Sequence, residues 1–288
     1  MTRLCVIGVG KIGGEVAFLA SVLGLVDELI LNDTYAPLLE AQQLDLLHTG
    51  LDIEVSTDSR AAESADICLF AAGSPRNPSI KTRVDLLSAN LPVADAAVRM
   101  LSGFDGILIT VTNPMDANNY YLCKKSGIDR HRCIGFGGQL DSARFNLALA
   151  ERCIPGEGWV FGEHGEHQVP FFGKISAGVL PDMREEILTE LCGSSMEVIN
   201  GKGGTVFGPA YHITDMIRQI LQDSRQTIPC SCVLDGEYGF DRCSLGVPAQ
   251  IGKEGIRTIE EWPLDGWEQQ KFNEAGAFVQ GLCEPLDL

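Results

Sequence analysis

Basic residues are scarce in this chain of 288 residues. Lys and Arg number 22 against 39 Asp and Glu, so the formal net charge is −17. A nucleic-acid-binding protein presents a basic surface to the phosphates, and anionic lipid headgroups repel an acidic chain. The composition therefore predicts no nucleic-acid partner and no membrane partner. Such an acidic excess is also compatible with a salty cytoplasm.

Long apolar runs are absent as well. No stretch approaches the roughly 18 residues that a membrane-spanning helix needs, and the N-terminal run Leu4–Ile7 is too short for the apolar region of a signal peptide. We therefore expect a cytoplasmic protein. Ten cysteines are present, several of them inside apolar runs, which favours reduced, buried thiols over a disulfide framework. Cys230 and Cys232 form the closest pair; without a second Cys/His pair at ligand spacing we interpret them as strand residues and expect no metal site.

The first half alternates short apolar runs with helical patterns. Strands are predicted at Leu4–Ile7, Leu29–Leu31, Ile53–Ser56, Ile67–Ala72 and Ile107–Thr112. Helices are predicted at Ile12–Leu23, Pro37–His48, Asp85–Leu101 and from Met115 to about Ser126. Apolar strands separated by helices indicate βαβ units in a buried parallel sheet. Because their crossovers are right-handed, the predicted fold class is α/β, a doubly wound parallel sheet of the Rossmann type.

The pattern changes after about Gly138. Helical stretches at Leu140–Arg152, Asp182–Asn200 and Pro209–Gln222 precede β-type runs at Ile228–Leu234 and Ser244–Pro248, and a last helix spans about Gly266–Leu282. This α+β pattern places a domain boundary at residue 138, with a dinucleotide-binding domain over 1–138 and a second domain over 139–288. No Pro/Ser-rich linker marks the boundary, so we expect the two domains to pack tightly.

A glycine-rich turn follows the first predicted strand and opens the first predicted helix. In Gly8-Val9-Gly10-Lys11-Ile12-Gly13, the glycines permit a tight turn, close approach to a pyrophosphate and close helix–strand packing, while the helix N-terminus offers amide donors. Asp33 closes the second strand about 20 residues later, where a carboxylate binds ribose hydroxyls and repels a 2′-phosphate. The pattern predicts NAD rather than NADP, with cofactor-binding residues Gly8, Gly10, Lys11, Ile12, Gly13 and Asp33. The alternative is a plain turn with a solvated Asp33.

Several longer motifs stand in order along the chain. They are Asp45-Leu46-Leu47-His48, Ala72-Gly73-Ser74-Pro75-Arg76, Val111-Thr112-Asn113-Pro114, Gly135-Phe136-Gly137-Gly138-Gln139-Leu140-Asp141-Ser142-Ala143-Arg144-Phe145, Gly162-Glu163-His164-Gly165, Gly236-Glu237-Tyr238-Gly239 and Gly246-Val247-Pro248. Together they resemble the motifs of the lactate/malate dehydrogenase family over essentially the whole chain. The resemblance implies a Rossmann cofactor domain, an α+β substrate domain with the active site between them, and a homodimer or homotetramer.

The chemistry of 2-keto acid reduction explains three of these residues. It needs a proton donor for the developing alkoxide, which suits histidine, and a cationic clamp for the substrate carboxylate, which suits arginine. His164 is the candidate acid/base, Asp141 its partner and Arg144 the clamp; Asp141 and Arg144 are spaced to share one helix face. Taken alone, each residue has an ordinary structural explanation, as a turn residue or as half of a surface ion pair.

The resemblance implies further site residues. Ser74–Arg83 is similar to the family's mobile loop, in which Arg83 would polarise the keto oxygen. Arg76 resembles the specificity arginine that binds a second carboxylate, although one extra residue between the two arginines leaves Asn77 as an alternative. Asn113 is implied to contact both substrate and nicotinamide, and further cofactor contacts are expected at Asn90 and Val111.

We therefore predict an NAD-dependent oxidoreductase that interconverts L-malate and oxaloacetate, a small dicarboxylate pair. The nearest alternative is an L-lactate or other 2-hydroxy acid dehydrogenase. A different class, an NAD- and metal-dependent glycosidase, would recruit His164 and His167 as metal ligands. A non-catalytic NAD-binding regulator would be expected to lack part of the His/Asp/Arg set, which this chain retains in full.

Overall fold

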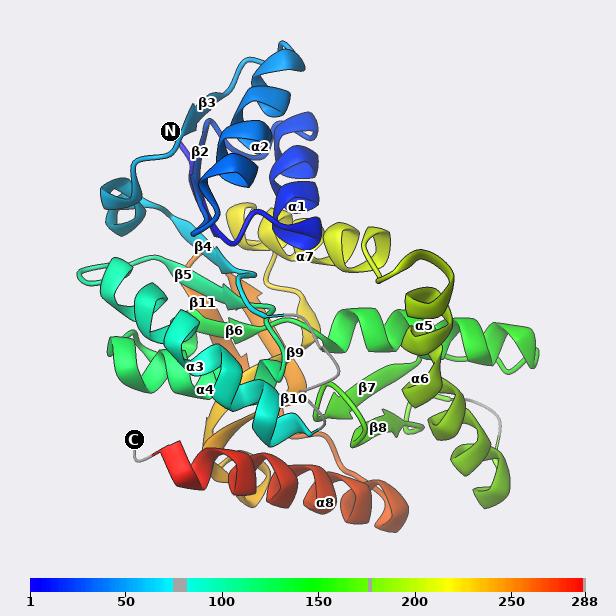
Figure 1. The fold of residues 1–288 in the computed structure, drawn as a ribbon. Helices are drawn as coiled ribbons and strands as arrows, with labels where there is room; N and C mark the ends of the chain where they lie inside the picture. Colours follow the sequence, from blue (N-terminus) through cyan, green and yellow to red (C-terminus); the bar gives the residue numbers. More distant parts are fainter. Residues whose placement is uncertain (75–81, 176–177, 287–288) are drawn as a thin grey trace.

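A single sheet organises the chain in the computed structural model, which describes residues 1–74, 82–175 and 178–286. Over these residues the sheet has 11 strands in the order β3-β2-β1-β4-β5-β6-β9-β10-β7-β8, and β11 pairs with β10 (Figure 1). The chain therefore builds one continuous ladder of strands, with helices packed on it.

The first part of the sheet is parallel, and we call it the parallel part. Its strands are β1 (Arg3–Ile7), β2 (Glu28–Asn32), β3 (Glu54–Ser56), β4 (Ile67–Phe70), β5 (Ile107–Thr110) and β6 (Cys133–Gly135). Its helices are α1 (Lys11–Val22), α2 (Ala36–His48), α3 (Arg83–Met100) and α4 (Met115–Ser126). β4 and β5 are buried at every residue, as expected for strands covered by helices on both faces. The predicted Rossmann-type parallel sheet is confirmed.

The remaining strands form an antiparallel part. β6 pairs with β9 (Thr227–Asp235), β9 with β10 (Asp241–Gly252), and β10 with β7 (Trp159–Gly162) and β11 (Gly255–Ile259), while β7 pairs with β8 (Gln168–Phe171). The helices are α5 (Gly138–Glu151), α6 (Pro181–Lys202), α7 (Phe207–Leu221) and α8 (Gly266–Cys283). The predicted α+β character of the second half is confirmed, but β6, β7, β8 and β11 were not predicted.

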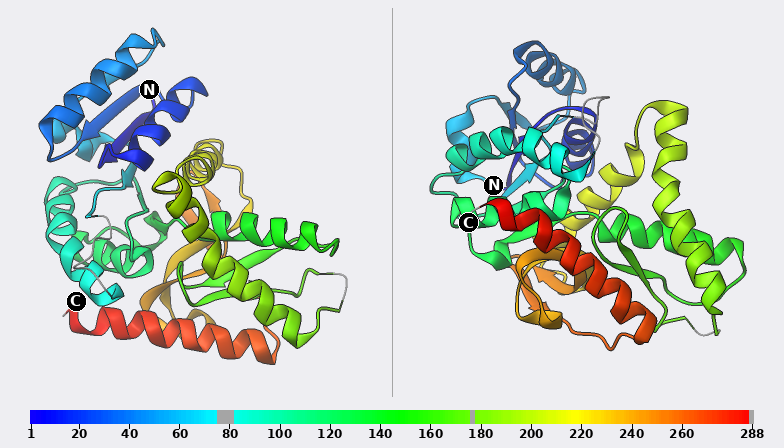
Figure 2. Two further views of the ribbon diagram at one scale, coloured as in Figure 1. Left: turned by 45° about the vertical axis from the view of Figure 1, so that its right-hand side comes forward. Right: turned by 60° about the horizontal axis from the view of Figure 1, so that its bottom comes forward.

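Short 3-10 helices complete the elements, at Ser59–Ser64, Arg130–Arg132, Glu237–Gly239 and Glu284–Leu286. α7 packs on α1, and α8 runs along the antiparallel part and also contacts α4 (Figure 2). Helices from one part of the sheet thus pack against elements of the other. Within the described ranges, no helix is long and apolar enough to cross a membrane.

The start of α3 differs from its prediction. The helix begins at Arg83, two residues before the predicted Asp85, because Thr82 and Asp85 form a capping box. The Thr82 hydroxyl accepts a hydrogen bond from the Asp85 amide at 3.1 Å, and the Asp85 carboxylate accepts one from the Thr82 amide at 2.9 Å. Arg83 is thereby held on a helix rather than in a loop.

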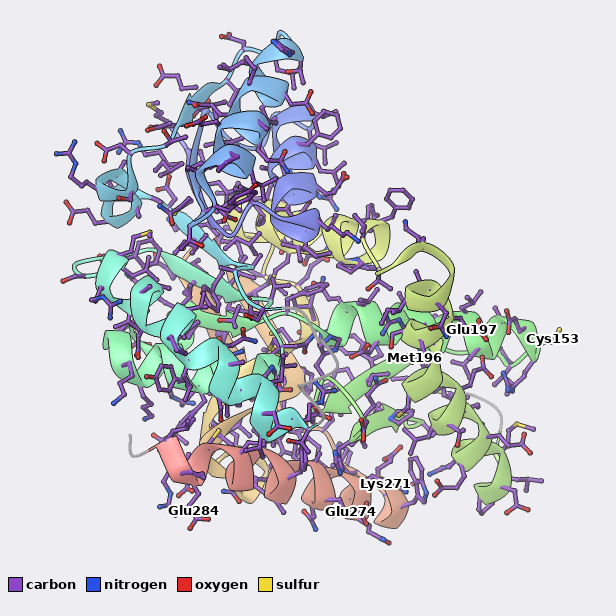
Figure 3. All side chains as sticks on the ribbon, in the orientation of Figure 1. Cys153, Met196, Glu197, Lys271, Glu274 and Glu284 are labelled. Carbon is purple, nitrogen blue, oxygen red and sulfur yellow. The ribbon has the colours of Figure 1, made fainter. Side chains whose placement is uncertain are left out.

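All ten cysteines are free thiols, and eight of them are buried. Cys230 and Cys232 lie fully buried in β9, which confirms the strand interpretation. Cys153 is the exposed exception at the end of α5 (Figure 3). The thiols therefore behave mostly as small apolar core residues.

Candidate active site

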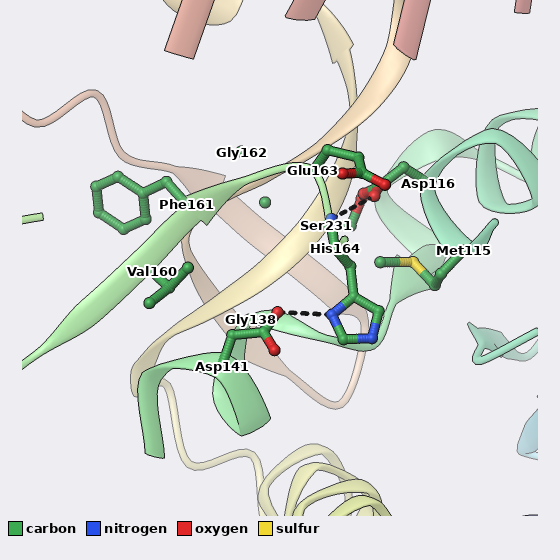
Figure 4. Close-up of a pocket in the computed structure, with 11 residues that line it drawn as sticks. Met115, Asp116, Gly138, Asp141, Val160, Phe161, Gly162, Glu163, His164 and Ser231 are labelled. Carbon is green, nitrogen blue, oxygen red and sulfur yellow. Dashed lines mark hydrogen bonds and ion pairs between the residues drawn. The ribbon is translucent and has the colours of Figure 1, made fainter. Parts of the chain in front are cut away.

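His164 and Asp141 meet where β7 ends and α5 begins. His164 lies in the loop after β7, and Asp141 lies in the first turn of α5. The imidazole Nδ1 is 2.6 Å from Oδ2 of Asp141 (Figure 4). An ionised carboxylate only accepts hydrogen bonds, so Nδ1 carries a proton and Nε2 is left to exchange one. The Asp141 side chain is buried, whereas 18% of the His164 side chain is exposed.

Arg144 lies one helical turn beyond Asp141. Its Nη1 donates a hydrogen bond to Oδ1 of Asp141 at 2.9 Å. One buried carboxylate therefore joins the imidazole and the guanidinium, and the structure brings the three residues of the predicted catalytic set together.

The surroundings favour a protonated His164. Burial alone lowers the pKa of the imidazole, but the charge of Asp141 and the hydrogen bond to it outweigh that effect, with help from Asp116. The net result is a pKa of His164 raised above its ordinary value of 6.5. The imidazolium can thus persist at neutral pH as a proton donor.

Asp116 is a site residue that the sequence analysis missed. It lies in the first turn of α4 and is 2% exposed. Its Oδ2 accepts a hydrogen bond from the backbone N–H of His164 at 2.8 Å, and its Oδ1 accepts one from the hydroxyl of Ser231 at 2.6 Å. An acidic residue in a first helical turn is usually explained by the helix dipole, so no local signal marks this one.

A second buried carboxylate, Glu163, precedes the histidine. Its Oε2 accepts a hydrogen bond from the His167 amide at 3.0 Å, and its Oε1 lies 3.5 Å from Nη2 of Arg83. Burial favours the neutral acid, but the nearby imidazole of His167, the charge of Arg83 and the bond from the His167 amide bring the pKa of Glu163 below its ordinary value. Arg83 therefore lies beside the His164 loop, and its Nε is buried without a hydrogen-bond partner among the described residues.

Asn90 ties together two loops at the carboxyl edge of the parallel part. Its Nδ2 donates to the backbone oxygen of Asn113 at 2.8 Å, and its Oδ1 accepts from the amide of Ser74 at 2.8 Å. Asn113 follows β5 with its side chain exposed, and Val111 is partly buried against the core. Asn90 thus positions the backbone of Asn113 and of Ser74.

The glycine turn lies against Asp33. Gly8 adopts a φ of +93°, which favours glycine. Oδ2 of Asp33 accepts a hydrogen bond from the amide of Val9 at 3.0 Å, and Oδ1 accepts one from the amide of Tyr35 at 2.9 Å. From the end of β2, the carboxylate therefore fixes the glycine turn that follows β1.

The start of α1 suits an anion. The N-cap residue Gly10 offers no side-chain cap, the first turn holds no acidic residue, and a Cβ on Gly10 would meet open space. A Cβ on Gly13 would instead overlap the carbonyl oxygen of Gly8. Lys11 donates from Nζ to the backbone oxygen of Gly203 at 3.2 Å, and Ile12 is partly buried. Uncapped amides with an open approach fit the pyrophosphate of a dinucleotide.

Two predicted residues cannot be placed. Arg76 and its alternative Asn77 lie outside the described residues. In the part of the chain that is described, no group of three or more His, Cys, Asp and Glu side chains is arranged to hold a metal ion.

Comparisons with known proteins identify the family of the chain. Residues 2–135 match the family model of the lactate/malate dehydrogenase NAD-binding domain, and residues 138–280 match that of the lactate/malate dehydrogenase alpha/beta C-terminal domain. A malate dehydrogenase of Halobacterium salinarum is 37% identical over 96% of both chains, and an L-lactate dehydrogenase of Geobacillus is 31% identical over 98% of this chain and 96% of its own. The structure of the malate dehydrogenase of Archaeoglobus fulgidus in complex with NADH is 29% identical, with a TM-score of 0.90 over the full length of both chains. With both halves of the chain matched, this protein belongs to the lactate/malate dehydrogenase family and carries that family's NAD-binding domain.

Proposed function

We propose that this enzyme is an NAD-dependent malate dehydrogenase that interconverts L-malate and oxaloacetate. The observation that carries the proposal is the bridge from His164 through Asp141 to Arg144, with contacts of 2.6 and 2.9 Å. It joins a proton-transfer group to a carboxylate-binding group, and an enzyme that oxidises a 2-hydroxy acid needs both. Relatives named malate dehydrogenase and L-lactate dehydrogenase both match, so the choice of substrate needs its own argument.

The cofactor site is proposed at the glycine turn. Gly8, Gly10, Lys11, Ile12 and Gly13 would hold the pyrophosphate, because this turn offers free amides and an open approach. Asp33 would bind the adenine ribose and repel a 2′-phosphate, which favours NAD over NADP. When bound, the nicotinamide cofactor supplies the hydride chemistry. At its nicotinamide end, Asn113 and Val111 would lie close by, with Asn90 holding Asn113 in place.

The proton step belongs to His164. Arg144 would bind the 2-carboxylate of the substrate, presenting the hydroxyl to Nε2. During malate oxidation Nε2 takes the hydroxyl proton, and in the reverse direction the imidazolium returns it to the oxygen. Asp141 stabilises the imidazolium in both directions. Arg83, which already lies beside the His164 loop, would stabilise negative charge on the substrate oxygen.

Arg76 is proposed to select the dicarboxylate. A guanidinium pairs with the distal carboxylate of oxaloacetate, whereas pyruvate has no second carboxylate to offer. The test is NADH oxidation with oxaloacetate and with pyruvate, repeated on Arg76→Gln. We expect oxaloacetate to be preferred, and the variant to lose on the order of a hundredfold in kcat/KM for oxaloacetate but not for pyruvate.

The control for this test is Arg60→Gln, which removes an exposed guanidinium far from the site. A wild-type enzyme that prefers pyruvate would support the lactate dehydrogenase alternative. Selectivity lost in Asn77→Ala but kept in Arg76→Gln would move the specificity site to Asn77.

The two histidines that a metal-dependent glycosidase would need as ligands are engaged in other contacts, which disfavours this alternative. Nδ1 of His164 is engaged by Asp141, and the His167 ring stacks on Phe278 with centroids 4.2 Å apart. Oxaloacetate reduction that survives a strong chelator would exclude this alternative.

We also propose that copies of the chain associate. Three helices expose pairs of apolar side chains at helical spacing, and a second copy of the chain could cover them. They are Phe18 and Val22 on α1, Leu44 and Leu47 on α2, and Phe207 and Tyr211 on α7. α6 adds the exposed Met196 (Figure 3). These surfaces support the expected homodimer or homotetramer.

A further inference from the structure

We propose that Asp116 is a positioning residue for His164: it holds the backbone of the histidine and supports the imidazolium as a second carboxylate, next to Asp141. The inference rests on the proposed function, since it assigns a role in the same proton transfer. It concerns a buried hydrogen-bonded network behind the imidazole that the mechanism above does not use.

Three elements converge on the carboxylate of Asp116. The residue comes from α4, His164 from the loop after β7, and Ser231 from β9. Its two oxygens accept hydrogen bonds from the His164 amide at 2.8 Å and from the Ser231 hydroxyl at 2.6 Å (Figure 4). The backbone that carries the imidazole is therefore anchored to α4, independently of the bond from the ring to Asp141.

A chain of donors runs towards Asp116. Nδ2 of Asn119 lies 2.9 Å from Oγ of Ser244, which lies 2.7 Å from Oγ of Ser231. An amide NH₂ can only donate and each hydroxyl has one proton, so the protons point from Asn119 through Ser244 and Ser231 to Asp116. At the other oxygen the His164 N–H is also an obligate donor. Both carboxyl oxygens thus serve as acceptors, and this arrangement is suited to the ionised form.

Other groups around Asp116 oppose its charge. Burial and the nearby Glu163 raise the pKa of Asp116 to about 7, although the bonds from Ser231 and His164 pull it down. The thiols of Cys243 on β10 and Cys283 on α8 also feel its charge, and their pKa values are raised, mainly by burial. The guanidinium of Arg83 pairs with the neighbouring carboxylate, Glu163.

These charges determine the direction in which Asp116 shifts the pKa of His164. As the pH rises through about 7, Asp116 gains its negative charge, and this charge favours the imidazolium. The proton donor is thereby retained to higher pH than Asp141 alone would allow. Removing the charge should lower the pKa of His164 and move the alkaline limb of oxaloacetate reduction to lower pH.

The test is Asp116→Asn, which keeps the shape and removes the charge; its amide oxygen can still accept from the His164 N–H, while its NH₂ faces the Ser231 hydroxyl. The pKa of the His164 imidazole is measured by NMR titration without substrate, with His164→Asn assigning the signal, and kcat/KM for oxaloacetate is measured against pH. We expect a lower imidazole pKa and a displaced alkaline limb, on which each unit of displacement lowers the rate about tenfold. KM at pH 6 should stay near the wild-type value because Arg144 is untouched.

Asp66→Asn is the matched control. Asp66 also accepts a backbone hydrogen bond, from Arg3 at 2.7 Å, at the far end of β1. This variant should leave both titrations unchanged.

Ser231→Ala is a second test of the role of Asp116. Without its donor, Asp116 ionises less readily, so the imidazole pKa should move in the same direction as in Asp116→Asn. The double variant should match Asp116→Asn alone, since Ser231 acts through the carboxylate. An unchanged imidazole pKa in Asp116→Asn would overturn the proposal. If the Asp116→Asn protein does not fold, an unchanged imidazole pKa in Ser231→Ala would overturn it instead. Absent activity of the wild type towards both keto acids would instead refute the proposed function, while the NMR titration still tests Asp116.

Discussion

Asp141 uses both of its carboxylate oxygens inside the site, one on the imidazole of His164 and one on Arg144. A displacement of this one side chain would therefore disturb proton transfer and substrate binding together. Asp116 and Ser231 complete the support of the histidine from behind, through its backbone.

His164→Asn should strongly reduce turnover while leaving the cofactor site intact. We expect kcat to fall by about 10²–10⁴-fold, because asparagine cannot exchange the proton, and NADH affinity to change little. Steady-state assays and NADH fluorescence titration measure the two effects. His48→Asn, an exposed histidine on α2, is the control. Turnover within a fewfold of the wild type would remove His164 from the mechanism.

The residues of the site differ in how far the sequence could reveal them. His164, Asp141 and Arg144 were predicted because the chemistry demands these residue types and the family motifs mark their positions. Asp116 and Ser231 were missed because their contacts join residues 48 and 115 positions apart, and neither has a local pattern of its own. Such partners become visible once the strands and helices are placed.

At the scale of elements, the glycine turn joins β1 to α1 and brings the two into close contact. Apolar strands such as β1, β4 and β5 were predicted because continuous burial leaves a clear pattern. β6, β7 and β8 have three or four residues each, and in each of them a glycine, proline or polar residue interrupts the apolar run, which leaves too little local signal.

Gly13→Ala tests the packing of that turn. The added Cβ would overlap the Gly8 carbonyl oxygen and crowd Val6, so α1 must shift away from β1. We expect a loss of stability of about 1–3 kcal/mol, seen in thermal unfolding, and a weaker affinity for NADH.

Gly193→Ala is the matched control for this substitution, because a Cβ there would meet open space on α6. It should be neutral or slightly stabilising. Equal NADH affinity of Gly13→Ala and the wild type would contradict the assigned role of the turn.

At the scale of the whole molecule, a net charge of −17 acts against association of identical copies. Salt screens this repulsion beyond about 8–10 Å at ordinary ionic strength, and more strongly at higher concentration. The apolar surfaces of α1, α2 and α7 would then come together without a large electrostatic cost.

Light scattering at increasing KCl should therefore show a mass that is a multiple of 31.1 kDa, with dissociation or a lower thermal midpoint at low salt. NaCl at equal ionic strength is the control, since screening depends on ionic strength rather than on the cation. A monomer at every salt concentration would contradict the proposed association.

The pairing of β6 with β9 has a mechanical consequence. Gly135 of β6 lies opposite Ser231 of β9, so the seam between the parallel and antiparallel parts runs past the hydroxyl that bonds Asp116. Across the same seam, the side-chain amide of Asn119 on α4 donates a hydrogen bond to the hydroxyl of Ser244 on β10. Rotating one part of the sheet against the other would break these hydrogen bonds. We therefore expect the two parts to move as one rigid body with the His164 imidazole, and any conformational change during turnover to take place in segments outside the sheet.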